Sequence, residues 1–137
     1  MIIVGLTGGL ACGKTTVAGM FNRHGALVLD ADKIAHRALF KGKGPYKKVL
    51  KKFGKDILNQ DKSINRKNLG KVVFESKKKQ QELCSIIHPW VFERIDEKLN
   101  SFRKNKAVKV VIIEAVLLIE SGFHKHMDLI IVIKSIY

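Results

Sequence analysis

The chain has 137 residues, of which 46% are hydrophobic and 28% charged, and its formal net charge is +14. This length corresponds to one domain, and the apolar content suffices for a core, which excludes a disordered chain. The two cysteines have no metal-binding spacing and no apolar signal segment precedes the first predicted strand, so we expect a reduced, cytoplasmic protein. The longest apolar runs have the length of strands, far below the roughly 18 residues of a membrane span, and we expect no membrane association.

The first predicted strand, residues 2–6, leads directly into the motif G-x-x-x-x-G-K-T at residues 8–15, and a helix is predicted at 14–24. A glycine-rich turn at this point directs backbone N–H groups and the positive end of the helix dipole toward a bound polyphosphate. Lys14 would neutralise the outer phosphates of ATP, and the Thr15 hydroxyl would bind Mg²⁺. The alternative is a glycine-rich turn with an incidental lysine. The predicted nucleotide-binding residues are Gly8, Gly9, Ala11, Cys12, Gly13, Lys14, Thr15 and Thr16.

A second strand is predicted at 26–29, after Gly25 ends the first helix. Asp30 and Asp32 follow this strand at its carboxyl end, where open α/β sheets place their active sites. Asp30 is well placed to cap a helix that begins near Lys33. Asp32 is harder to explain structurally, and it could face the cleft above Lys14 and accept the proton of an attacking hydroxyl group.

Almost eighty residues of mainly helical pattern separate the second predicted strand from the third, too many for one crossover. We therefore expect a helical insert, placed at 41–105. Residues 41–79 contain thirteen lysines and Arg66 against three carboxylates, and so hold eleven of the fourteen net positive charges. This segment could attract an anionic substrate, bind nucleic acid or simply be a solvated surface. With 7% aromatic residues and no zinc-finger or RNP-type motif, we expect no nucleic-acid partner.

Within the insert a helix is predicted at 80–102, with a break or kink at His88 and Pro89 because proline lacks the backbone donor. Further strands are predicted at 108–113 and 129–133, and Glu114 ends the first of them. Glu114 could hold Mg²⁺ through water, or it could be an ordinary acidic residue leaving a buried strand for solvent.

The four short, almost continuously apolar strands predict an α/β fold. It would be a three-layer, parallel sheet of the P-loop NTPase type with an inserted helical subdomain, all in one domain over residues 1–137. Only four residues follow the last predicted strand, too few for a returning helix. We therefore expect the fold to be incomplete at the carboxyl end and the sequence to be the front portion of a longer protein.

Several segments taken together resemble the dephospho-CoA kinase family. The resemblance covers essentially the whole chain, and its most particular parts are the Asp-Ala-Asp sequence at 30–32, Arg66-x-x-Leu69, His88-Pro89 and the segment 117–120. It implies transfer of the γ-phosphoryl group of ATP to the 3′-hydroxyl of dephospho-CoA, with Lys14 and Asp32 as catalytic residues. The acceptor-binding residues it implies are Asp32, Arg66, His88, Leu117 and Leu118.

The chain also departs from the family pattern. Ala11 and Cys12 stand where glycine and serine are usual, and Val116 replaces the proline that usually precedes the paired leucines. The arginine-bearing lid of the family has no counterpart in this sequence. These departures leave two alternatives to the full kinase activity: a fragment that only binds phosphates with weak or absent turnover, and a related kinase for another small-molecule hydroxyl.

Overall fold

The computed structural model describes residues 1–9, 13–116 and 122–134. The chain divides into two compact units. The first, which we call the sheet unit, comprises Met1–Asp32 and Arg94–Tyr137. The second, the helical unit, comprises Lys33–Glu93. The predicted acceptor-binding role of an insert at 41–105 stays a prediction.

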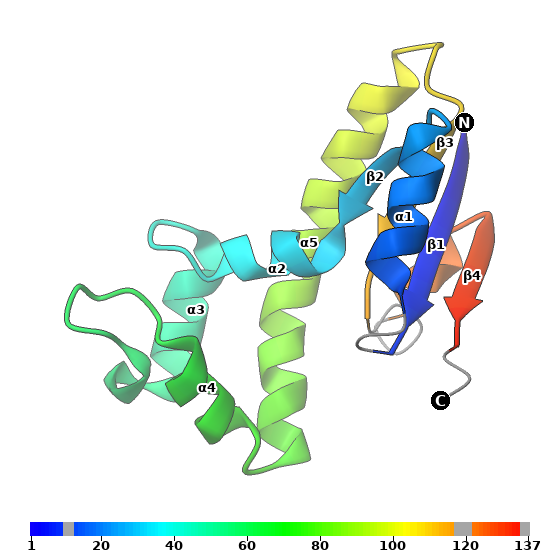
Figure 1. The fold of residues 1–137 in the computed structure, drawn as a ribbon. Coiled ribbons are helices and arrows are strands. Elements are labelled where there is room, and N and C mark those ends of the chain that lie inside the picture. The colour runs from blue at the N-terminus through cyan, green and yellow to red at the C-terminus, as the bar shows by residue number, and fades with distance from the viewer. Residues whose placement is uncertain (10–12, 117–121, 135–137) are drawn as a thin grey trace. The chain divides into compact units, whose positions relative to one another are not determined.

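The sheet unit contains a parallel sheet in the order β2-β3-β1-β4 (Figure 1). The register places Glu114 beside both Leu6 and Asp30. Because the strands are parallel, their carboxyl ends meet at one edge of the sheet. The α/β class and the four predicted strands are therefore confirmed. The strands are β1 (Ile2–Gly8), β2 (Leu27–Asp30), β3 (Val110–Glu114) and β4 (Leu129–Ile133).

Helix α1 (Lys14–Arg23) packs against this sheet, with Ala18 buried beside Leu6 and Ile112 (Figure 1). The helix ends at a glycine, as predicted: Gly25 has φ +98°, and the N–H groups of Gly25 and Ala26 donate to the carbonyls of Asn22 and Phe21. This pair of bonds is a Schellman cap, which satisfies carbonyls that the helix leaves without partners. The cap returns the chain directly into β2.

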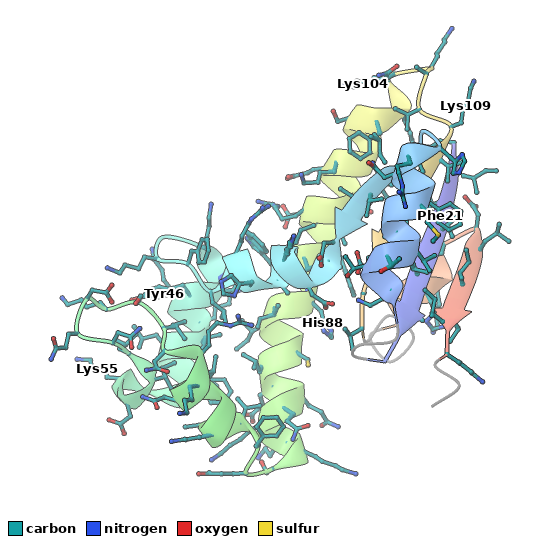
Figure 2. The ribbon with its side chains drawn as sticks, viewed as in Figure 1. Phe21, Tyr46, Lys55, His88, Lys104 and Lys109 are labelled. Atoms are coloured by element: carbon teal, nitrogen blue, oxygen red, sulfur yellow. The ribbon has the colours of Figure 1, made fainter. Side chains whose placement is uncertain are left out.

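The helical unit is built around five buried aliphatic side chains, Val49, Ile57, Ile64, Leu69 and Val73. Many lysine side chains project from its surface, Lys55 among them (Figure 2). The predicted concentration of positive charge is thus a property of one compact unit. Its elements are most of α2 (Ala31–Ala38), α3 (Gly44–Phe53), η1 (Lys55–Ile57), α4 (Arg66–Val73) and the first part of α5 (Lys77–Arg103).

Helix α5 is continuous through Pro89, so a break at His88 and Pro89, one of the two predicted alternatives, is wrong, and a kink there stays a prediction. Proline removes one helical hydrogen bond, but packing of apolar side chains provides most of a helix's stability in a protein. Leu83 and Ile86 pack against the core of the helical unit, and Ile95 and Leu99 are buried in the part of α5 that belongs to the sheet unit. No helix among the described residues is long and apolar enough to cross a membrane.

Candidate phosphate-binding and phosphoryl-transfer site

Gly13 sets the start of α1. Its φ is +88°, in the left-handed region, and its carbonyl accepts the first helical bond from the Val17 N–H at 3.0 Å. A Cβ atom at this position would touch no atom of the described residues within 4 Å, and the positive φ by itself favours glycine. Lys14 and Thr15 then occupy the first turn of α1, where the helix dipole favours negative charge.

Glu114 joins these two side chains at the carboxyl end of β3. Its Oε1 accepts hydrogen bonds from Lys14 Nζ at 3.3 Å and from Thr15 Oγ1 at 3.1 Å. The Lys14 and Glu114 side chains are only 12% and 6% exposed. Glu114 therefore does not leave the strand for solvent, which was one of its two predicted interpretations. It is a buried carboxylate that forms an ion pair with the lysine of the phosphate-binding motif.

Asp32 also lies near this lysine. Its Oδ2 is 4.0 Å from Lys14 Nζ and accepts a hydrogen bond from the Val116 N–H at 3.2 Å. The side chain is 53% exposed, so a substrate hydroxyl could approach it. Asp32 therefore lies near Lys14, and its role as a proton acceptor stays a prediction.

Val116 also contributes to the site, and the sequence did not predict this contribution. Its N–H holds Asp32, and its carbonyl accepts the Thr7 hydroxyl at 3.0 Å. Ala115 N–H also donates to the Leu6 carbonyl at 3.0 Å. The segment after β3 is therefore tied to the end of β1, and it presents a main-chain donor to the catalytic candidate. The only sequence signal was that residue 116 departs from the family pattern.

The other predicted residues are distributed as follows. Gly8 ends β1, and Gly9 and Thr16 are exposed on either side of the motif's undescribed part. Ala11, Cys12, Leu117 and Leu118 lie outside the described residues. Arg66 and His88 belong to the helical unit.

His88 stacks on Phe92 with ring centroids 5.7 Å apart (His88 is labelled in Figure 2). Burial of its imidazole lowers the pKa of His88 below its ordinary value of 6.5. The side chain is therefore neutral at neutral pH, and it can accept as well as donate a hydrogen bond.

A magnesium ion would find suitable ligands beside Lys14. Thr15 Oγ1 and Glu114 Oε1 are 3.1 Å apart, and both are oxygen donors of the kind that Mg²⁺ prefers. Among the described residues no group of three or more His, Cys, Asp or Glu side chains could hold a metal ion alone. In magnesium–nucleotide sites, phosphate oxygens and waters supply most ligands.

Comparison with known proteins gives matches that share one name, dephospho-CoA kinase. The family model described as dephospho-CoA kinase matches residues 2–136. The dephospho-CoA kinase of Aquifex aeolicus is 40% identical over 98% of this chain and 67% of its own length. The dephospho-CoA kinase of Lactobacillus johnsonii is 42% identical over 88% of this chain and 60% of its own length. The solved dephospho-CoA kinase of Campylobacter jejuni is 32% identical with a TM-score of 0.73, over 95% of this chain and 64% of that one.

A solved Thermus thermophilus protein is 28% identical with a TM-score of 0.79, covering 96% of this chain and 64% of that one. The chain thus spans about 60–67% of the length of these relatives. The fold is shared with the two solved structures. The chain therefore belongs to the dephospho-CoA kinase family, the P-loop kinases of coenzyme A biosynthesis.

Proposed function

We propose that this protein transfers the γ-phosphoryl group of ATP to the 3′-hydroxyl of dephospho-CoA, giving coenzyme A. The observation that supports it most is the cluster at the carboxyl edge of the sheet, where Lys14 Nζ lies within 4.0 Å of the carboxylates of both Glu114 and Asp32. A cation for the phosphates, a hydroxyl for the metal and an exposed carboxylate for the acceptor are the groups that phosphoryl transfer requires.

In this proposal the N–H groups at the start of α1 and the Lys14 ammonium bind the phosphates of ATP. Thr15 and Glu114 hold Mg²⁺, which when bound neutralises charge on the phosphate oxygens. Lys14 is paired with Glu114 in the structure, and phosphate oxygens would become its new partners. Most of the rate acceleration then comes from positioning and charge neutralisation.

Asp32 acts as the general base. As the 3′-oxygen of the acceptor forms a bond to the γ-phosphorus, its proton passes to the Asp32 carboxylate and the bond between the γ-phosphorus and the bridging oxygen of ADP breaks. The Val116 N–H holds one carboxylate oxygen, Oδ2, so that the other is free for this proton. Dephospho-CoA itself is anionic because it carries a diphosphate. Arg66, His88, Leu117 and Leu118 are proposed to bind it, and the lysine-rich helical unit to attract it.

A second candidate is the binding of phosphates with little turnover. Lys14 and the N–H groups at the start of α1 suffice for phosphate binding, whereas transfer also needs an acceptor hydroxyl at Asp32. The chain spans about 60–67% of the length of these relatives.

The decisive experiment incubates the chain with ATP labelled in the γ-phosphate, with Mg²⁺ and with dephospho-CoA, AMP or no acceptor. We expect labelled coenzyme A with dephospho-CoA, none in the Asp32→Asn variant, and wild-type rates in the matched exposed control Asp96→Asn. Removal of Mg²⁺ by a chelator should abolish transfer. Preferential labelling of AMP would show a kinase for another acceptor, and binding of ATP without transfer would support the phosphate-binding candidate.

A further inference from the structure

The sheet unit contains a pocket with a volume of about 380 Å³, at the edge of the sheet where β2 and β3 begin and α1 ends. Four apolar side chains line it: Phe21, Ala26, Ala107 and Val110. The phosphate-binding cluster lies at the other edge, where the strands end. The volume falls within the range of small-molecule sites, so this pocket is a second candidate site, separate from the first.

A helix cap and small residues form one wall of the pocket. Gly25, which also lines it, has φ +98° and no side chain. The Asn22 side-chain amide donates to the Ala26 carbonyl at 3.0 Å and so fixes the turn that follows α1. Ala26 is buried in the core cluster between α1 and the sheet, and Phe21 and Val110 pack against the same cluster. The floor of the pocket is therefore continuous with the core.

The connection from α5 to β3 forms another wall. Asn105 holds it in place, because its side-chain Oδ1 accepts the Ala107 N–H at 3.0 Å and its carbonyl accepts the Val108 N–H at 3.1 Å. The Lys109 carbonyl accepts the Ile2 N–H at 2.8 Å (Lys109 is labelled in Figure 2). Lys109 therefore starts from an anchored backbone position. A ligand would meet walls that are already in place, which reduces the entropy lost on binding.

The polar groups of the pocket are hydrogen-bond donors. Its two ionisable lining side chains, Lys109 and His24, are both basic. In the part of the chain that the structure describes, neither has a side-chain hydrogen bond or ion pair. The main-chain N–H groups of Gly25, Ala26 and Ala107 are already engaged. The polar contacts of a ligand would therefore fall to the ammonium and imidazole groups, which call for an acceptor.

The stretch of chain that includes Lys109 is rich in cations. Between Glu97 and Glu114 the sequence has no carboxylate. The five cationic residues in that interval are Lys98, Arg103, Lys104, Lys106 and Lys109. On the other wall, Arg23 is the last residue of α1 and His24 caps it. Positive charge on both walls attracts an anionic ligand to this edge of the sheet.

We propose that this pocket binds a small monocarboxylate whose body is an aromatic ring or a short apolar chain. The Lys109 ammonium pairs with the carboxylate, and the His24 imidazole donates a hydrogen bond to it. The apolar body lies against Phe21, Ala107 and Val110 and removes their surface from water. This site is apart from the one proposed for phosphoryl transfer, and its ligand binds whether or not the chain is a kinase.

A phosphate ester fits this pocket less well. The pocket lies at the carboxyl end of α1, where the helix dipole disfavours negative charge, and a phosphate monoester carries up to about twice the charge of a carboxylate. Phosphates bind instead at the amino ends of helices. Among the described residues that line the pocket there is no arginine, whose planar guanidinium suits phosphate oxygens. One ammonium beside an imidazole matches a single negative charge.

The test is titration of the isotope-labelled full chain with 3-phenylpropanoate, followed by the NMR chemical shifts of the backbone N–H groups. We expect saturable shifts at Gly25 and Ala107, with and without ATP. Lys109→Ala should weaken binding roughly 5- to 30-fold, between the losses typical of exposed and of buried charged partners. Lys106→Ala removes the same charge from the same connection, outside the pocket, and should change the affinity less than about twofold. Lys109→Gln is the second variant if Lys109→Ala lowers the thermal stability.

Two further comparisons test the shape of the pocket and the charge of the ligand. Ala107→Trp should abolish binding, because the indole ring fills the pocket. 3-Phenylpropanamide keeps the ring but is neutral, and it should bind the wild type roughly 5- to 30-fold more weakly than 3-phenylpropanoate. Phenyl phosphate should also bind more weakly than 3-phenylpropanoate.

Several results would overturn the proposal. They are the absence of saturable shifts at millimolar 3-phenylpropanoate, equal losses in the Lys109 and Lys106 variants, unchanged binding by Ala107→Trp, and binding of the amide or of phenyl phosphate as tight as that of the carboxylate. Shifts centred on the exposed apolar residues of β4 instead of the pocket would also overturn it, since they would show unspecific apolar contact. ATP binding, measured on the same samples, tests the kinase proposal separately.

Discussion

Replacement of Glu114 by glutamine tests the buried ion pair of the site. Glutamine keeps the size of the side chain and its Oε1, so that Thr15 retains its acceptor while Lys14 loses the opposite charge 3.3 Å away. Both partners are almost fully buried. The substitution therefore isolates the contribution of charge at this position.

The expected loss of stability follows from two opposing effects. Two charges at this separation attract by about 5 kcal/mol at an effective dielectric constant of roughly 20, but desolvation of both groups offsets much of that attraction. Removal of one partner leaves a buried charge, which typically costs about 3–5 kcal/mol. Because Asp32 remains 4.0 Å from Lys14, we expect the lower end of this range, about 3 kcal/mol.

The assay is urea unfolding followed by far-ultraviolet circular dichroism, with and without ATP. The matched control is Glu97→Gln, which removes a 61% exposed partner of Arg94 and should cost less than about 1 kcal/mol. ATP added without Mg²⁺ should stabilise Glu114→Gln more than the wild type, since its phosphates give Lys14 a new counter-charge and no metal ligand is lost. A Glu114→Gln variant as stable as Glu97→Gln would refute the assigned ion pair.

Three further predictions concern the backbone and pH. Gly13→Ala should destabilise the chain by roughly 1–2 kcal/mol because residue 13 has a positive φ. Gly19→Ala, inside α1 with no described atom within 4 Å of an added Cβ, should stabilise the chain. Thermal unfolding measures both, and a change of stability in the same direction for the two variants would contradict this prediction. Val116→Pro removes the N–H group that donates to Asp32. A double-mutant cycle with Asp32→Ala, measured by urea unfolding, should give a coupling free energy of about 0.5–1.5 kcal/mol. Purely additive losses of stability would show that this hydrogen bond contributes nothing. His88 has a lowered pKa in the folded state, so the unfolded state binds its proton first and stability falls as the pH drops below about 6.5 toward the lowered value. His88→Gln should reduce this fall between pH 7.5 and 5, and an unchanged pH profile would exclude His88 as its source.

The parts of the fold that were predicted correctly have strong local signals. The strands are short apolar runs, and Gly13 and Gly25 mark the two ends of α1 because both need a positive φ. The position of Asp32 near Lys14 also followed from the sequence, since parallel strands bring their carboxyl ends to one edge.

The parts that were not predicted depend on contacts between distant segments. Whether Glu114 is solvated or buried is decided by Lys14 and Thr15, about a hundred residues earlier in the chain. The role of Val116 lies in its main-chain N–H, which no side-chain pattern reveals. Pro89 indicated a break by its own chemistry, but the packing of its neighbours in α5 outweighs the lost hydrogen bond. Helix α2 likewise begins at Ala31 instead of near Lys33, directly after β2.

The central claim is that the start of α1 and the Lys14 ammonium bind the phosphates of ATP. Calorimetric titration of ATP into the wild type and Lys14→Ala, with circular dichroism to confirm that both are folded, tests it most directly. The wild type should bind ATP, and the folded Lys14→Ala variant should not. Equal ATP affinity in the two proteins, or none in the wild type, would contradict it.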